Sequence, residues 1–219
     1  MKAIGVTGGV GCGKSEILRQ LQHSCVCEVI RTDDVANDLK EPGGACYDAI
    51  VAMLGEDVLE AGKGSRIDRA KMAGKIFGDE ALLKKVNDLL HPAVRQVVIE
   101  KLEAEDARGI LDVMFIEAAL LLECGYASES TREAIEKASI PVNKAYGITL
   151  DEMWYVYAPQ DVRRKRLKEY RGYSDEKIDG IMQKQLSEEQ FRAGSDFVID
   201  NGGSLADALA QAKERLKLV

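Results

Sequence analysis

Short apolar runs alternate with amphipathic stretches along much of the chain. Runs with the length and composition of buried strands are expected at residues 3–6, 27–30, 110–116, 153–157 and 197–199. Between them, apolar residues recur at helical spacing, as Ile17, Leu18 and Leu21 do after the first run. Strands that alternate with helices predict an α/β fold with a parallel sheet covered on both faces.

The pattern changes between residues 45 and 107, where no convincing strand is found. Helices are expected there at residues 47–54, 69–77, 80–90 and 93–105. We therefore expect residues 45–107 to form a helical, substrate-binding subdomain inserted into a single domain, residues 1–219. Residues 1–44, 108–159 and 195–219 would form the core, and the polar, charge-dense helical stretch 160–190 would form a lid.

Composition and charge narrow the functional classes. Apolar residues make up 46% and charged residues 31% of the 219 residues, and no run is long enough to span a membrane. A formal net charge of −7 argues against a general nucleic-acid binder. The number of cysteines, five, is odd, and their spacing is not that of a disulfide scaffold. No export signal precedes the first expected strand. We therefore expect the protein to be located in the cytoplasm.

One motif carries most of the expected chemistry. The segment GGVGCGKS matches G-x-x-x-x-G-K-[ST] between an expected strand and an expected helix, the context that a phosphate-binding P-loop requires. The residues expected to bind ATP are Gly8, Gly9, Val10, Gly11, Cys12, Gly13, Lys14, Ser15 and Glu16. Lys14 would reach the β- and γ-phosphates, and the Ser15 hydroxyl would bind Mg²⁺. The expected fold class is therefore a P-loop NTPase-type sheet flanked by helices.

The acceptor side of the reaction depends on Asp33. This residue follows the second expected strand, at the sheet edge where ligands of open α/β sheets bind. Its carboxylate can accept a proton from an attacking hydroxyl as general base. Alternatively, Thr32 or Asp33 caps a helix that runs to Leu39, and the two roles are compatible.

A family resemblance then becomes specific. Residues 4–15 resemble the opening of dephospho-coenzyme A kinases, and residues 29–36 (VIRTDDVA) are similar to the family's V-I-D-A-D-x-I-A, with Asp33 on the aspartate considered the catalytic base. Further similar segments are Asp68-Arg69, Phe77-Gly78-Asp79, Leu90-His91-Pro92, residues 117–123 (EAALLLE) and residues 196–201 (DFVIDN). Together they span most of the chain in the family's order.

The resemblance implies that ATP phosphorylates the ribose 3′-hydroxyl of dephospho-CoA to give coenzyme A and ADP, with Mg²⁺ as cofactor. Thr7, Asp33 and His91 are expected to contact the substrate. Before Pro92, His91 has the alternative role of ordering the end of a helix. A monomer is expected, with no nucleic-acid or membrane partner.

The chain also departs from the family pattern. Arg31 replaces the first aspartate of D-A-D, Ala119 replaces a proline, and the stretch between Cys124 and Asp151 is longer than usual. In the lid, Arg171 is displaced by one residue from the family's arginine, which aligns with Tyr170, and Ile181 stands where many members have another arginine. Arg171 is nevertheless the expected catalytic cation, and the alternative is that the charges of residues 163–171 form a solvated helix face.

Two other functions remain open from the sequence. Another small-molecule P-loop kinase, for a nucleotide or nucleoside, would share the loop, lid and inserted helices. A nucleotide-dependent regulatory switch would make no phosphorylated metabolite, and it would need segments that sense the γ-phosphate, but the chain has no clear G-protein-like D-x-x-G or N-K-x-D motif. Dephospho-CoA kinase activity is the interpretation that accounts for the most residues.

Overall fold

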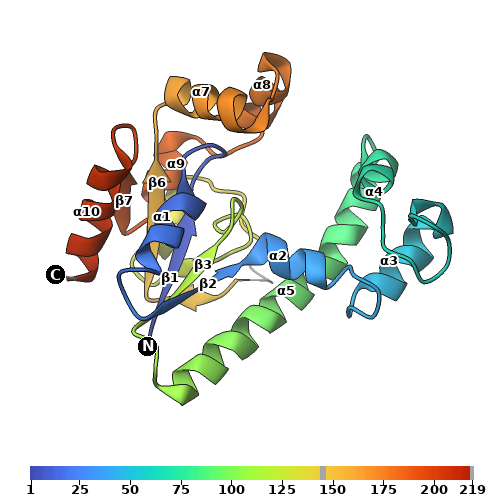
Figure 1. Cartoon of the computed structure of the whole chain (residues 1–219), viewed down its shortest axis with the longest axis horizontal. Coiled ribbons are helices and arrows are strands. Elements are labelled where there is room, and N and C mark those ends of the chain that lie inside the picture. The colour runs from blue at the N-terminus through green and yellow to red at the C-terminus, as the bar shows by residue number, and fades with distance from the viewer. Residues whose placement is uncertain (144–146, 218–219) are drawn as a thin grey trace. The chain divides into compact units, whose positions relative to one another are not determined.

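The computed structural model describes residues 1–143 and 147–217. Its main sheet has five strands in the order β2-β3-β1-β6-β7 (Figure 1). They are β1 (Lys2–Thr7), β2 (Cys27–Arg31), β3 (Val113–Glu117), β6 (Glu152–Tyr157) and β7 (Phe197–Asp200). β1 pairs in parallel with β3 and β6, and β6 pairs in parallel with β7. The expected α/β fold class is confirmed.

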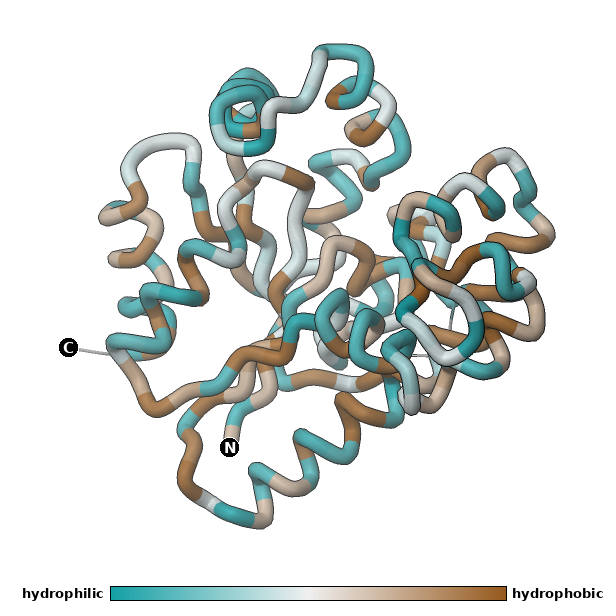
Figure 2. Tube along the Cα trace, turned by 45° about the vertical axis from the view of Figure 1, so that its right-hand side comes forward, coloured by the Kyte–Doolittle hydropathy of each residue, from teal (hydrophilic) through white to brown (hydrophobic). Residues whose placement is uncertain are grey.

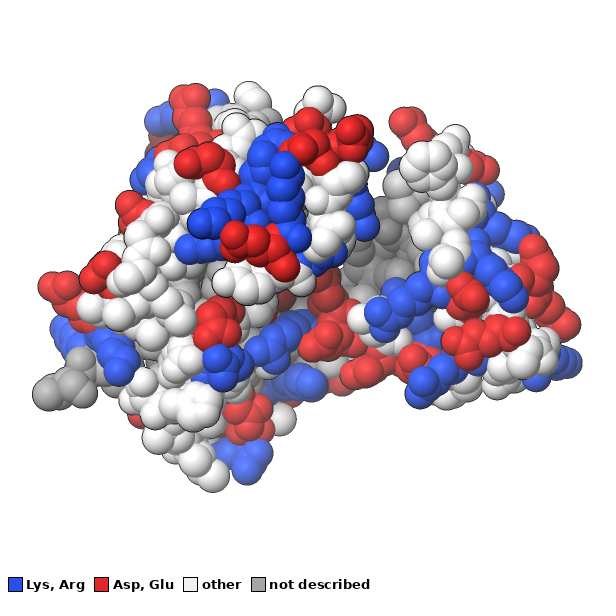
Figure 3. All heavy atoms as spheres, turned by 45° about the horizontal axis from the view of Figure 1, so that its top comes forward, with Lys and Arg blue, Asp and Glu red and all other residues white. Residues whose placement is uncertain are grey.

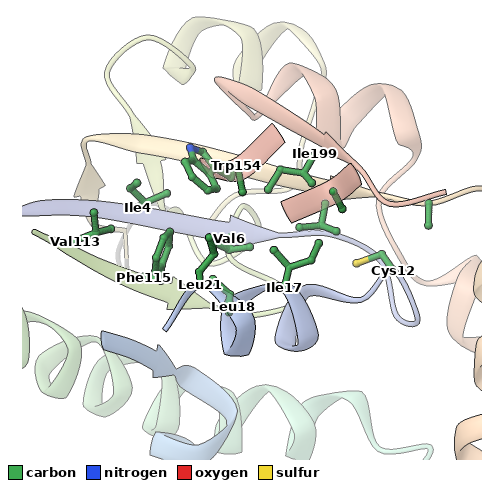
Figure 4. Packing of buried hydrophobic residues seen from close by; sticks show 14 residues of the cluster. Ile4, Val6, Cys12, Ile17, Leu18, Leu21, Val113, Phe115, Trp154 and Ile199 are labelled. Carbon is green, nitrogen blue, oxygen red and sulfur yellow. The ribbon is translucent and has the colours of Figure 1, made fainter. Parts of the chain in front are cut away.

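The central strands are apolar because helices cover them. α1 (Lys14–Leu21) and α10 (Leu205–Leu216) pack against each other and on the sheet. Figure 4 shows Ile17, Leu18 and Leu21 of α1 among the labelled side chains around Val6 and Phe115. Burying one such side chain contributes roughly 1.5 to 3 kcal/mol, so this layer fixes α1 and thereby the loop before it.

The chain divides into two compact units, residues Met1–Ile30 with Leu102–Val219, and Arg31–Lys101. The second unit contains α2 (Thr32–Asp38), α3 (Tyr47–Leu54), the 3₁₀ turn η1 (Glu56–Val58), α4 (Arg69–Ile76) and most of α5 (Glu80–Arg108). Its own core includes Ile50, Leu54, Met72, Val86 and Leu90. The unit begins at Arg31 and ends at Lys101, whereas we expected a helical region at 45–107.

Helix α5 corrects one expectation. Two helices, 80–90 and 93–105, were expected on either side of Pro92, but one helix runs from Glu80 to Arg108 with Pro92 inside it. Proline removes a single N–H from the helical ladder. Val86, Leu90, Val94 and Val98 are buried at a spacing of four residues on both sides of it, and this continuous apolar stripe favours one helix.

Three helices follow β6. They are α7 (Gln160–Arg171), α8 (Asp175–Gln183) and α9 (Glu188–Ala193). Figure 2 shows α7, near the top of the view, as largely hydrophilic. Phe191 of α9 is buried and its ring stacks on Tyr155 of β6 at 4.9 Å between centroids, so α9 is held on the sheet. We keep the name lid for residues 160–190.

The long connection between β3 and β6 forms a small substructure. β4 (Ala127–Ser128) pairs in parallel with β5 (Thr149–Leu150), and α6 (Arg132–Lys137) lies between them in sequence. Helix α6 thus lies in the stretch between Cys124 and Asp151 that is longer than the family pattern. Over the described ranges 1–143 and 147–217, no helix has the length and apolar character needed to cross a lipid bilayer.

Candidate active site

The P-loop connects β1 to α1 and depends on glycine at two positions. Gly8 has φ +145° and Gly13 has φ +95°, which side chains rarely adopt. A Cβ atom on Gly8 would lie 2.5 Å from the Val156 carbonyl oxygen, and one on Gly13 would lie 2.3 Å from Asn201 Nδ2. Glycine is therefore required here for both conformation and space.

The N-terminus of α1 leaves anion-binding donors available. Its N-cap is Gly13, which makes no side-chain cap hydrogen bond, and the first-turn N–H groups of a helix have no intrahelical partner. Such a terminus attracts phosphate through these donors and through the helix dipole. Lys14 Nζ donates to the Gly8 carbonyl oxygen at 2.7 Å, which places the ammonium at the start of the loop.

Ser15 is joined to a carboxylate that the sequence analysis did not assign to the site. Its Oγ donates to Glu117 Oε1 at 2.6 Å. Glu117 is the last residue of β3, the strand beside β1, and only 8% of its surface is exposed. P-loop enzymes hold Mg²⁺ with the loop hydroxyl and a carboxylate on a neighbouring strand. Its position at the end of a buried strand was the signal that would have found Glu117.

Asn201 and Arg166 brace the other end of the loop and were also not assigned to it. Asn201 Nδ2 donates to the Cys12 carbonyl oxygen at 2.7 Å. Arg166 donates from Nη1 to the same oxygen at 3.3 Å and from Nη2 to the Asn201 carbonyl oxygen at 2.9 Å. Asn201 follows β7 directly, so the strand end determines its position.

The lid contributes a second contact with the loop. Arg163 of α7 and Gln185, just after α8, both hydrogen bond to Val10. Arg171, the expected catalytic cation, is exposed at the last position of α7, and its side chain has no hydrogen bond or ion pair to the residues described. Figure 3 shows basic side chains gathered over the lid helices with acidic side chains beside them. The structure thus brings Arg163, not Arg171, to the P-loop.

Two further expected residues lie next to the loop. Thr7, the last residue of β1, is fully buried, and its Oγ1 has no hydrogen-bond partner in the described part of the chain. The Glu16 carboxylate accepts hydrogen bonds from Arg19 and Gln20, and the bond from Arg19 is the main cause of its lowered pKa. Glu16 is thus engaged within α1, and its contact with ATP stays a prediction.

Asp33 and His91 belong to the second unit. The N-cap of α2 is Arg31, without a side-chain cap hydrogen bond, so the interpretation of Thr32 or Asp33 as the cap is wrong. The helix begins one residue earlier because Thr32 already has helical conformation. His91 lies inside α5, so it does not order a helix end. Burial lowers the pKa of His91, and the nearby charge of Asp88 partly opposes this effect. Their substrate contacts stay predictions.

Comparison with known proteins identifies the relatives of this site. The family model described as dephospho-CoA kinase matches residues 2–144. The chain belongs to the dephospho-CoA kinase family. The family membership confirms the expected resemblance and the expected class of enzyme, a kinase.

Individual relatives agree over nearly the full length. A dephospho-CoA kinase from Corynebacterium diphtheriae is 31% identical over 204 residues, covering 93% of this chain and 90% of the relative. One from Aquifex aeolicus is 32% identical over 216 residues, covering 98% and 95%. A crystal structure of a Thermus thermophilus protein superposes with a TM-score of 0.74 at 25% identity, covering 99% of this chain and 96% of that chain.

Proposed function

We propose that the chain transfers the γ-phosphoryl group of ATP to the ribose 3′-hydroxyl of dephospho-CoA, giving coenzyme A and ADP. Membership of the dephospho-CoA kinase family supports the reaction. The observation that carries the residue assignments is the 2.6 Å hydrogen bond between Ser15 and Glu117. It joins the loop that binds phosphate to the carboxylate that phosphoryl transfer requires beside it.

Ser15 and Glu117 also fit a magnesium ion. A hydroxyl and a carboxylate are hard oxygen ligands of the kind that Mg²⁺ prefers, and Mg²⁺ commonly uses few protein ligands beside substrate phosphates. When bound, the ion supplies positive charge to the β- and γ-phosphate oxygens. Ser15 would be a direct ligand, and Glu117 would orient the Ser15 hydroxyl and add negative charge next to the ion.

The protein's own groups account for the remaining steps. The 3′-oxygen forms a bond to the γ-phosphorus as the bond to the bridging oxygen of ADP breaks, and the hydroxyl proton passes to the Asp33 carboxylate. Lys14 stabilises the negative charge on the phosphate oxygens. Thr7 and His91 are proposed substrate contacts. Asp33 is proposed on its place in the chain, two residues after β2 ends at Arg31.

The direct test is turnover with purified protein, MgATP and dephospho-CoA, with the product identified by mass. Coenzyme A, heavier than dephospho-CoA by one phosphoryl group, is the expected product, and EDTA should abolish it until Mg²⁺ is restored. Lys14→Ala is the matched negative control. Phosphorylation of nucleosides or nucleotides in preference to dephospho-CoA would indicate a different kinase, and phosphate release without a phosphorylated acceptor would indicate a switch.

We also propose that the enzyme acts as a monomer in the cytoplasm. The loop, Lys14, Ser15 and Glu117 come from one chain, so these groups need no second copy. All five cysteines are free thiols, as is usual in a reducing compartment. Light scattering on the purified protein would measure the oligomeric state.

A further inference from the structure

Arg163 makes a closed set of contacts with the P-loop. Its Nε donates to the Val10 carbonyl oxygen at 2.9 Å, and its Nη2 donates to Gln185 Oε1 at 2.6 Å. The same Gln185 oxygen accepts the Val10 N–H at 3.2 Å. One loop residue is therefore bound on both its polar backbone groups by the lid, and the lid residues are bound to each other.

The arginine lies at the end of the loop where the transferred phosphate is expected. A Cβ atom on Gly9 would lie 2.3 Å from Arg163 Nη2 and 2.7 Å from Nη1, so the guanidinium packs directly on the Gly9 backbone. Lys14 Nζ contacts the neighbouring Gly8. Because a P-loop lysine reaches the β- and γ-phosphates, Gly8 and Gly9 mark the γ-phosphate end.

Three other cations of the lid, Arg164, Lys168 and Arg166, are engaged elsewhere, whereas Arg171 is distant from Arg163 along α7. Arg164 pairs with Asp175 and Asp179 of α8, and Lys168 pairs with Asp175. Arg166 holds carbonyl oxygens at the opposite end of the loop. Arg171 lies eight residues beyond Arg163, which is about 12 Å further along the helix axis.

We propose that Arg163 is the lid cation that stabilises the transferred phosphoryl group, and that Gln185 is the positioning residue that holds its guanidinium. This inference rests on the proposed function. Nη1 has no hydrogen bond to the residues that the structure describes, and it supplies the first donor to a phosphate oxygen. A guanidinium offers paired donors with the spacing of phosphate oxygens, and it keeps its proton throughout the transfer.

The test compares kcat with ligand affinity in matched variants. Arg163→Met should lower kcat by about 10²- to 10³-fold, as removal of one preorganised donor does, and should change ADP affinity by less than about threefold. Affinity for ADP with aluminium fluoride, a mimic of the transferred group, should fall with kcat. Lys165→Met, an exposed cation on the same helix, should match the wild type.

Two further variants keep the proposal falsifiable. If Arg163→Met does not fold, Arg163→Lys retains the charge but not the paired donors, and should still lose about tenfold in kcat. Gln185→Ala should lower kcat less than Arg163→Met, with unchanged ADP affinity. A kcat within threefold of wild type for Arg163→Met overturns the proposal, as does an equal loss of ADP affinity or a larger loss in Arg171→Met. A wild-type enzyme inactive on dephospho-CoA would instead contradict the proposed function.

Discussion

Asp33 has an exposed carboxylate in the first turn of α2, where it makes no cap hydrogen bond. Asp33→Asn keeps the shape of the side chain but removes its capacity to accept a proton. If Asp33 is the general base, this change should lower kcat by about 10²- to 10⁴-fold. The helix should lose less than about 1 kcal/mol, because only a favourable charge near its N-terminus is removed. Turnover with dephospho-CoA, measured beside ATP affinity, checks this expectation.

Asp34→Asn is the matched control for Asp33. Asp34 is also exposed and also lies in the first turn of α2, so both variants lose the same charge from the same helix end. Equal turnover in the two variants would leave Asp33 a surface residue and move the search for the base elsewhere.

At the scale of residues, the sequence predicts the site residues that are neighbours in the chain, but not the residues that reach the site from distant segments. The P-loop could be found from spacing because its glycines, Lys14 and Ser15 are neighbours in the chain. Glu117, Asn201 and Arg163 reach the loop from three distant segments, and only the strand order brings them together. Arg171 is the catalytic cation that alignment with the family motif suggests. Contact with the P-loop depends instead on which side of α7 a residue occupies, and Arg163 is on the side that contacts Val10.

At the scale of elements, ion pairs join α7 and α8 into one helical hairpin. Arg164 and Lys168 pair with α8, and Lys177 lies over the Tyr173 ring in the turn between them. We expect MgATP to slow protease cleavage at residues 172–174, because a lid that shields the phosphoryl group from water must close over it. Equal cleavage with and without MgATP would count against a lid.

Arg164→Met provides a second arm of the proteolysis experiment. It removes both pairs of Arg164, and surface ion pairs contribute little individually. Cleavage at 172–174 without nucleotide should therefore rise only about two- to fivefold, and Lys165→Met should leave it unchanged.

Helix α5 shows why element boundaries were harder to predict than elements. From the sequence alone, Pro92 predicts a break, because proline disrupts helix interiors. The apolar spacing of Val86, Leu90, Val94 and Val98 continues across it, and buried packing outweighs the loss of one hydrogen bond. Elsewhere, the local spacing of apolar residues predicts whether a segment is a strand or a helix, and the fold keeps this local pattern.

At the scale of the whole molecule, Glu152 ties together three parts of the first unit. It accepts hydrogen bonds from Lys2 of β1, from Trp154 Nε1 at 2.7 Å and from Arg215 Nε of α10 at 3.1 Å. Burial alone would raise the pKa of Glu152. The three hydrogen bonds together lower the pKa by more than burial raises it, so the net pKa is below the usual value. The ionised form therefore stabilises the fold.

The sign of this shift gives a pH dependence. The stabilisation is present above the unfolded pKa of about 4.3 and is lost as pH falls through the lowered folded pKa. Glu152→Gln should cost about 1 to 2 kcal/mol at pH 7, and the difference from wild type should shrink towards pH 3. Trp154 is the only tryptophan and contacts Glu152, so its fluorescence follows urea unfolding of this unit. Glu214→Gln, on exposed surface of α10, should behave as wild type; a constant difference across the pH range would refute the assignment.

The fit between Gly9 and Arg163 has a consequence for any substitution at position 9. The guanidinium occupies the space that any side chain at position 9 would need. A methyl group there would require the guanidinium of Arg163 to move away from the Val10 carbonyl oxygen and Gln185 Oε1, its hydrogen-bond acceptors. The residue at position 9 therefore influences where the guanidinium of Arg163 lies, although the two positions are 154 residues apart in sequence.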